Sequence, residues 1–445
     1  KLGGVFSTRR EPYFFDYIQD ELIQRYGVGV YRQGGLKVYT TIDPKAQQQA
    51  RAAIKKNLYL PNDPSSAVVS IDPKTGYIKA MAASGSYKSR SFNLAAQGHR
   101  QPGSSFKPMV LVTALLEGVD PESTTYVSKP LHLNVPGFGP WNVKTYSNSY
   151  GGRMNLVQAT LKSDNTVYAQ LDLDVGPRKV AETAHKLGIT THLDGFPAEG
   201  LGGLRLGVSP LEMADAYATL ASGGIHSKPE GIRRVVFPDG HQDVLGKPKQ
   251  NRAIPEGVAA EATRILEQNV QKGTGTAANY SCPAAGKTGT TDNFNDAWFV
   301  GYIPNMATSV WVGYPNAATE MRSVHGISVA GGTFPAQIWH DYMSVAHKGC
   351  GQFAFINAKA DFHPFFGDHA ATGGSTPGGG NDFGTPAPGG TPAPRRHDNG
   401  NGGKGFDPRL YESPPQQAPT IGNGNGHGNG NGHGHHGAGA GTGTG

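Results

Sequence analysis

The sequence has few cysteines and no long apolar segment. Only Cys282 and Cys350 occur among its 445 residues, which excludes a disulfide-dense scaffold and a four-cysteine zinc site. We favour two unpaired buried thiols, and the alternative is a single bridge, which would persist outside the cytoplasm. No run approaches the roughly 18 apolar residues that cross a bilayer, so this sequence contains no such hydrophobic segment.

The chain also lacks a dense run of charge of either sign. Its formal net charge is +6, but the lysines and arginines are scattered between acidic residues. A nucleic acid binds to a concentrated basic surface, and this pattern does not predict one. Nucleic acid is therefore not expected as a partner.

Glycine and proline are concentrated towards the C-terminal end. Residues 366–445 are dominated by Gly, Pro, Asn and Thr with interspersed His. Such a segment cannot bury enough apolar surface to offset the entropy of ordering, so we expect a disordered tail. Its histidines lie in a Gly-Asn repeat without fixed geometry, and we predict no metal site there.

The first part of the chain divides into two regions. Residues 1–60 mix charged and aromatic residues, and we expect them to form a linker or docking region. Two β-rich runs at 66–72 and 77–83 flank a Pro-Lys-Thr-Gly turn sequence, which predicts a hairpin. This hairpin is expected to open the main domain, which we place at residues 61–365.

The main domain continues with a helical block and then returns to strands. Helices are predicted at 104–117, 155–171, 177–187 and 210–221. A strand at 232–237, a helix at 255–271, three β-rich runs at 284–290, 296–303 and 306–313, and a last helix at 335–345 follow. Strands at both ends with helices between them predict an α+β fold whose two ends meet on one sheet.

The sharpest chemical feature is Ser104 followed three residues later by Lys107, at the start of a predicted helix. Residues three apart lie on one helix face, so the hydroxyl and the amine can touch. A serine is a poor nucleophile until a base takes its proton, and a lysine can do so when apolar neighbours such as Phe106 and Met109 depress its pKa. Taken alone, the spacing of Ser104 and Lys107 is explained better by a helix-capping serine beside a solvated lysine than by a catalytic pair. The assignment therefore depends on the other motifs.

Two further motifs follow in order. Ser163-Asp164-Asn165 lies at a predicted helix boundary, and Lys287-Thr288-Gly289-Thr290 lies in a β-rich run. Two similar triplets, Lys74-Thr75-Gly76 and Ser91-Phe92-Asn93, precede Ser104, which is the wrong order, and we assign both to structure. The trio in this order resembles the active-site motifs of the penicillin-recognising serine acyltransferases.

The flanking residues narrow the resemblance to class A penicillin-binding proteins. They are Arg100-Gln101-Pro102-Gly103-Ser104, Gly207-Val208-Ser209-Pro210-Leu211-Glu212, Gly286-Lys287-Thr288-Gly289-Thr290-Thr291 and Asp296-Ala297-Trp298-Phe299-Val300-Gly301. The match extends over roughly residues 35–345. It implies a β-lactamase/transpeptidase-like fold with a mainly antiparallel five-stranded sheet covered by helices, an all-helical subdomain, and the active site at their junction.

The implied function is a D,D-transpeptidase that crosslinks peptidoglycan stem peptides through a serine acyl-enzyme and binds β-lactams covalently. No cofactor is implied, and the enzyme would act at the outer face of the bacterial cytoplasmic membrane. Proteins of this class usually carry an amino-terminal membrane helix and a glycosyltransferase domain. Because this chain begins with Lys1 rather than Met, we expect it to be part of such a membrane-anchored parent.

The resemblance also implies roles for individual residues. Ser104 would attack the carbonyl between two terminal D-alanines, Lys107 would accept its proton, and Ser163 would relay that proton to the leaving amine. Asn165 would hold the substrate amide, and Lys287 would supply positive potential near the substrate carboxylate. The substrate-binding residues of the third motif would be Thr288, Gly289 and Thr290.

Related activities remain as alternatives. A class A β-lactamase needs a glutamate that activates water after the second motif, and no Glu followed three residues later by Leu-Asn occurs in that region. A D,D-carboxypeptidase would use the same serine and lysines. A β-lactam-binding sensor would keep the fold without turnover, although all three motifs here retain their chemical groups.

Overall fold

The structure is a computed structural model that describes residues 11–84, 93–315, 319–347 and 349–373. Most of the predicted tail, from residue 374 onward, lies outside the described residues. Within the described part, no helix is both long enough and apolar enough to cross a membrane.

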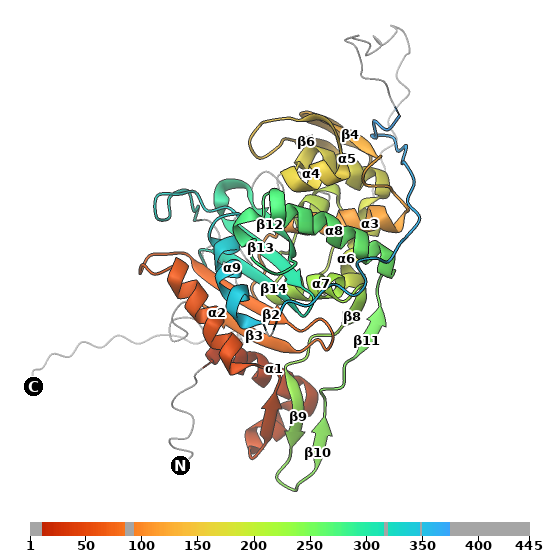
Figure 1. Ribbon diagram of the computed structural model, residues 1–445. Helices are drawn as coiled ribbons and strands as arrows, with labels where there is room; N and C mark the ends of the chain where they lie inside the picture. Colours follow the sequence, from red (N-terminus) through yellow and green to blue (C-terminus); the bar gives the residue numbers. More distant parts are fainter. Residues whose placement is uncertain (1–10, 85–92, 316–318, 348, 374–445) are drawn as a thin grey trace, which may run out of the picture.

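The core of the molecule is one five-stranded antiparallel sheet (Figure 1), as predicted. Its strands, in spatial order, are β12 (Ala285–Thr290), β13 (Asp296–Ile303), β14 (Met306–Gly313), β2 (Ser65–Ile71) and β3 (Ile78–Ala83). The early hairpin pairs with the late meander through β2 and β14, so the two ends of the domain do meet on one sheet. β12 lies at one edge.

Helices cover both faces of the sheet. One face packs on α7 (Pro210–Ala221) and α8 (Glu256–Lys272), and the other packs on α2 (Pro44–Asn57) and α9 (Phe334–Ala346). Consecutive residues of β13 point to opposite faces of the sheet. Trp298 packs in the hydrophobic core on the α7 and α8 side, which we call the first core, and Phe299 packs in the second core, on the α2 and α9 side. β13 and β14 are buried along their whole length, which explains why most of their residues are apolar.

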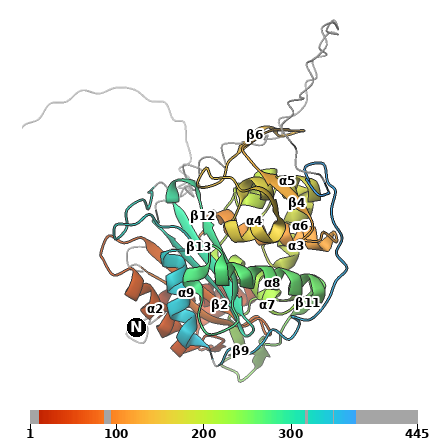
Figure 2. The ribbon, with the colours of Figure 1, turned by 45° about the horizontal axis from the view of Figure 1, so that its top comes forward.

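A helical region lies beside the edge that β12 forms (Figure 2). It contains α3 (Lys107–Leu116), α4 (Leu156–Lys162), α5 (Asn165–Val175) and α6 (Pro177–Leu187). Two small antiparallel strand pairs complete it: β4 (Thr125–Ser128) pairs with β7 (Gly152–Asn155), and β5 (Leu131–Val135) pairs with β6 (Gly139–Val143). The single helix predicted at 155–171 is wrong, because Ser163 is left-handed (φ 54°) and Asp164 caps a second helix, whereas the boundary predicted at Ser163-Asp164-Asn165 is confirmed.

The N-terminal segment, predicted as a linker or docking region, packs on the main domain. α1 (Pro12–Gln33) buries Phe14, Ile18 and Leu22 in the first core. β1 (Lys37–Thr40) pairs with β9 (Ile232–Val236), and β10 (Gln242–Val244) completes that small sheet. The remaining strands, β8 (Ile225–Ser227) and β11 (Gln250–Arg252), pair with each other.

The two cysteines form a disulfide, so our preference for free thiols was wrong. Cys282 lies just before β12, and Cys350 follows α9. The bridge therefore ties the entrance of the edge strand to the chain after the last helix. The sequence did not indicate this because α9 and the strand order bring together residues 68 positions apart.

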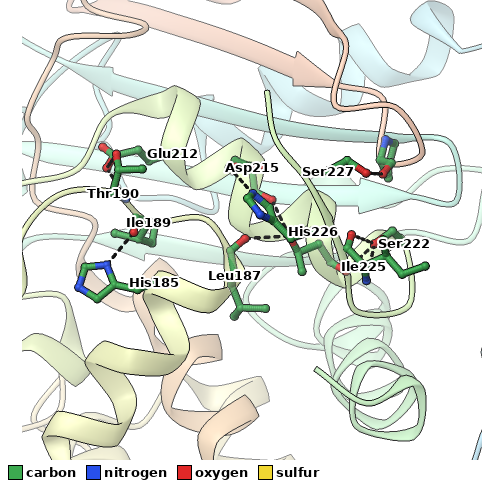
Figure 3. Close-up of polar contacts among 12 residues, drawn as sticks. His185, Leu187, Ile189, Thr190, Glu212, Asp215, Ser222, Ile225, His226 and Ser227 are labelled. Atoms are coloured by element: carbon green, nitrogen blue, oxygen red, sulfur yellow. Dashed lines mark hydrogen bonds and ion pairs between the residues drawn. The ribbon is translucent and has the colours of Figure 1, made fainter. Parts of the chain in front are cut away.

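Helix α7 is fixed to its surroundings by a buried carboxylate (Figure 3). The Glu212 side chain accepts hydrogen bonds from the backbone N–H and hydroxyl groups of Thr190, Thr191 and Ser209 at 2.6–3.1 Å. One helical turn on, Asp215 accepts from His226 at 2.9 Å. Burial alone would raise the pKa of Glu212, but these donors hold it below its usual value.

Replacing Glu212 by Gln should destabilise the protein by about 2 kcal/mol at pH 7, since the charge-assisted hydrogen bonds are lost. The folded-state pKa is depressed, so the contribution of the carboxylate is present above pH 4.5 and is lost as the pH falls through the folded-state pKa. Urea unfolding at pH 7 and at pH 3 measures both effects. Glu182→Gln, at an exposed position on α6, is the control and should change little; equal stability of the two variants at pH 7 would contradict the assignment.

Candidate active site

Ser104 lies on a tight turn between the sheet and the helical region. The turn is a short 3₁₀ helix, η2 (Gly103–Phe106), which runs directly into α3, and Gly103 has a φ of 51°. The preceding Gln101 exchanges two side-chain hydrogen bonds with the backbone of Leu204. The Trp298 indole of β13 donates to the Gln101 carbonyl at 2.8 Å, so the turn is fixed from both sides.

Lys107 is fully buried one helical turn after Ser104. Its amine donates to the Ser163 backbone oxygen at 2.8 Å and to Asn165 Oδ1 at 2.7 Å. Burial lowers the pKa of Lys107 well below its usual range, and the positive charge of Lys287 lowers it further. A neutral amine at this position can accept a proton.

Lys287 is the second buried amine of the site. Its Nζ lies 2.8 Å from Ser163 Oγ, and burial lowers the pKa of Lys287 to about 7. Lys107 Nζ lies 3.4 Å from the same hydroxyl. Ser163 Oγ is thus held between the two amines, and a proton can be exchanged among the three groups.

The left-handed residue Ser163 depends on Asp164, which the sequence analysis had given no role. The Asp164 carboxylate caps α5 by accepting from Val167 N at 3.0 Å and also accepts from the hydroxyls of Thr166 and Ser128. The signal was present in the sequence, because Asp is a preferred residue at a helix N-terminus.

The third motif forms the edge strand β12. Thr288 Oγ1 lies 2.7 Å from Thr274 Oγ1, a residue that the sequence analysis missed, and Thr290 Oγ1 accepts from Gly331 N at 3.0 Å. A Cβ at Gly289 would lie 2.3 Å from the Pro102 carbonyl oxygen. Gly289, which the sequence analysis assigned to substrate binding, packs closely against the turn that carries Ser104.

These elements enclose a cleft of about 610 Å³. Five of the eight residues named from the sequence line it: Ser104, Ser163, Asn165, Thr288 and Thr290. Lys107 and Lys287 are fully buried and reach Ser163, one of the residues of the cleft wall. Gly289 packs against the turn beneath the cleft.

The two triplets assigned to structure do not approach this cleft in the described part of the chain. Lys74-Thr75-Gly76 forms the turn between β2 and β3, as predicted, and Thr75 and Gly76 donate to the Asp72 carbonyl. In the other triplet, Asn93 is buried and donates to the Tyr13 carbonyl at 2.8 Å. Ser91 and Phe92 lie outside the described residues.

Comparison with known proteins gives the family. Residues 66–338 match the model of the penicillin-binding protein transpeptidase domain. The chain belongs to this family. Penicillin-binding protein 2D of Bacillus subtilis is 32% identical over 80% of this chain, and penicillin-binding protein 1B of Escherichia coli is 34% identical over 74%. The chain spans 52% and 40% of the lengths of these two relatives.

Solved structures agree with this family assignment. The penicillin-binding protein PonA1 of Mycobacterium tuberculosis has a TM-score of 0.68 and 30% identity, covering 80% of this chain and 96% of that one. A second structure holds the same protein in complex with penicillin V, with a TM-score of 0.67 and 29% identity over 80% of this chain and 97% of that one. The penicillin-binding fold predicted from the motifs is confirmed.

The close backbone contact at Gly289 makes a prediction about stability. In Gly289→Ala, the new methyl group would overlap the Pro102 carbonyl, and neither backbone can move without disturbing the sheet or the turn. We expect a loss of about 1–3 kcal/mol in the free energy of unfolding, measured with urea.

Gly29→Ala is the matched control, because a Cβ there would have no atom within 4 Å. It should be neutral or slightly stabilising, since Gly29 lies in α1. If Gly289→Ala were as stable as Gly29→Ala, the packing that we assign to Gly289 would be wrong.

Proposed function

We propose that this chain is the catalytic part of a serine D,D-transpeptidase that crosslinks peptidoglycan stem peptides. The observation that carries the proposal is the pair of buried amines that meet at Ser163 Oγ, with one of them a single helical turn from Ser104. Family membership over residues 66–338 supports the same reaction. The catalytic domain would be residues 61–365, with 1–60 as its docking segment and 366–445 as a tail.

Acylation would begin with attack of Ser104 Oγ on the carbonyl carbon of the terminal peptide bond. Neutral Lys107 would take the hydroxyl proton, and the new C–O bond would give a tetrahedral oxyanion. The backbone N–H groups of Ser104 and Thr290 would bind that oxyanion; losing one such donor costs about 3–4 kcal/mol of barrier. The C–N bond then breaks, Ser163 passes a proton to the leaving D-alanine amine, and an acyl ester remains.

Substrate binding would use the free edge of the sheet. Among the residues that the structure describes, β12 pairs with a strand only on its β13 side, so an extended peptide could add along the other side as a further antiparallel strand. The peptide carboxylate would lie near Lys287 and Thr288, and the Asn165 side chain would hold a substrate amide. An amine of a second stem peptide would then attack the ester and release Ser104.

Location and ligands follow from this chemistry. Stem peptides are found outside the cytoplasmic membrane, so the chain would work at its outer face, within a membrane-anchored parent that also carries a glycosyltransferase domain. The disulfide between Cys282 and Cys350 supports an oxidising environment. β-Lactams would acylate Ser104 because their strained amide resembles the scissile bond.

Intact-mass measurement after incubation with benzylpenicillin tests the proposal. The wild-type chain should gain one drug mass that persists for minutes, and Ser104→Ala should gain none. Ser147→Ala, which removes a different hydroxyl from the cleft wall, should still be acylated. Rapid loss of the adduct with consumption of drug would instead indicate a hydrolase, and labelling of Ser104→Ala would exclude Ser104 as the nucleophile.

A further inference from the structure

Two aromatic side chains meet beside the cleft, which one of them, Tyr146, lines. Tyr146 comes from the loop between β6 and β7, and Phe294 comes from the loop between β12 and β13. Their ring centroids lie 5.7 Å apart at an interplanar angle of 75°, which is a favourable edge-to-face arrangement. The Tyr146 side chain nevertheless remains 56% exposed, so it lies at the surface rather than inside the hydrophobic core.

Phe294 is held in an unusual backbone conformation. Asn293 and Phe294 both have positive φ values, 61° and 59°, which bulky residues rarely adopt. The Arg322 guanidinium lies 5.2 Å from the centre of the Phe294 ring, and the Phe294 carbonyl accepts from Met321 N at 2.9 Å. Such strain persists only where surrounding contacts maintain it, and it is concentrated at functional sites.

Both aromatic loops are continuous with residues that would hold the acyl donor. Phe294 follows Thr290 by four residues, and Thr291 and Asp292 between them line the cleft. On the opposite wall, Asn165 Nδ2 donates to the Lys144 carbonyl at 3.0 Å, two residues before Tyr146. On each side of the cleft, the aromatic residue therefore lies a few residues along the chain from a group that would bind the substrate or from a residue hydrogen-bonded to such a group.

The order of groups along β12 indicates what would reach this pair. A donor with its carboxylate at Lys287 and Thr288 and its reacting carbonyl at Ser104 and Thr290 continues toward residues 291–294. The part of the donor that precedes its terminal dipeptide would therefore lie there. In a penicillin, the acylamino side chain occupies the corresponding position.

We propose that Tyr146 and Phe294 form a specificity wall that contacts the acyl donor beyond its terminal dipeptide, preferring apolar or aromatic side chains. This inference rests on the proposed function, because it assumes acylation at Ser104. Tyr146 contributes through its ring rather than its hydroxyl, since the contact with Phe294 is between rings. The loop between β12 and β13, with its positive φ values at Asn293 and Phe294, holds the Phe294 ring in place as the second residue of the wall.

The test compares two β-lactams that differ only in this side chain. Benzylpenicillin carries a phenylacetyl group, and 6-aminopenicillanic acid carries none. The ratio of their second-order acylation rate constants should fall about fivefold in Tyr146→Ala, because one aromatic partner of the side chain is lost. Phe294→Leu should lower the ratio in the same direction, whereas Tyr146→Phe should retain the wild-type ratio.

Tyr39→Ala is the matched control, since Tyr39 is an exposed tyrosine on β1 away from the cleft, and it should leave the ratio unchanged. An unchanged or increased ratio in Tyr146→Ala would overturn the specificity wall while leaving the proposed function standing. If neither compound acylated the wild-type chain, the proposed function and this inference would both fail.

Discussion

The burial of two lysine amines around one serine hydroxyl is the constraint on which the rest of the site depends. An amine removed from water loses the hydration that stabilises its charge, so its pKa falls. Lys107 and Lys287 are both fully buried, and each is close enough to Ser163 Oγ to share a proton with it. A lysine whose pKa is lowered by burial can act as a base, so the site does not require a histidine for that role.

Three local departures from regular structure hold these groups together. The helix that would have continued through Ser163 is broken there, the chain before α3 tightens into a 3₁₀ turn, and β12 packs on that turn through Gly289. Each departure occurs where the sheet and the helical region meet. The disulfide just before β12 and the buried α7 carboxylate then fix the elements on which that junction is built.

The sequence predicted the elements whose boundaries depend on local signals. The meander from β12 to β14 and the helices that begin at Pro177 and Pro210 lie where turn and capping residues placed them. The helix boundary at Ser163-Asp164-Asn165 was predicted, but the left-handed conformation of Ser163 was not, and the contact of Asp164 with Ser128 of β4 exists only in the fold. Thr274 and the contact between Tyr146 and Phe294 were missed, and the disulfide was only the less favoured alternative, because residues far apart in the sequence become neighbours only through the fold.

The most direct test of the two-amine account is the pH dependence of the acylation rate constant with benzylpenicillin. In the proposed mechanism Lys107 must be neutral to accept the Ser104 proton, so the rate should rise with pH as Lys107 loses its charge and then level off. Because burial and Lys287 depress the pKa of Lys107, this rise should be complete well below pH 10.5. A rate that is still rising through pH 10.5 would show that Lys107 titrates as an ordinary solvated lysine and would contradict the account.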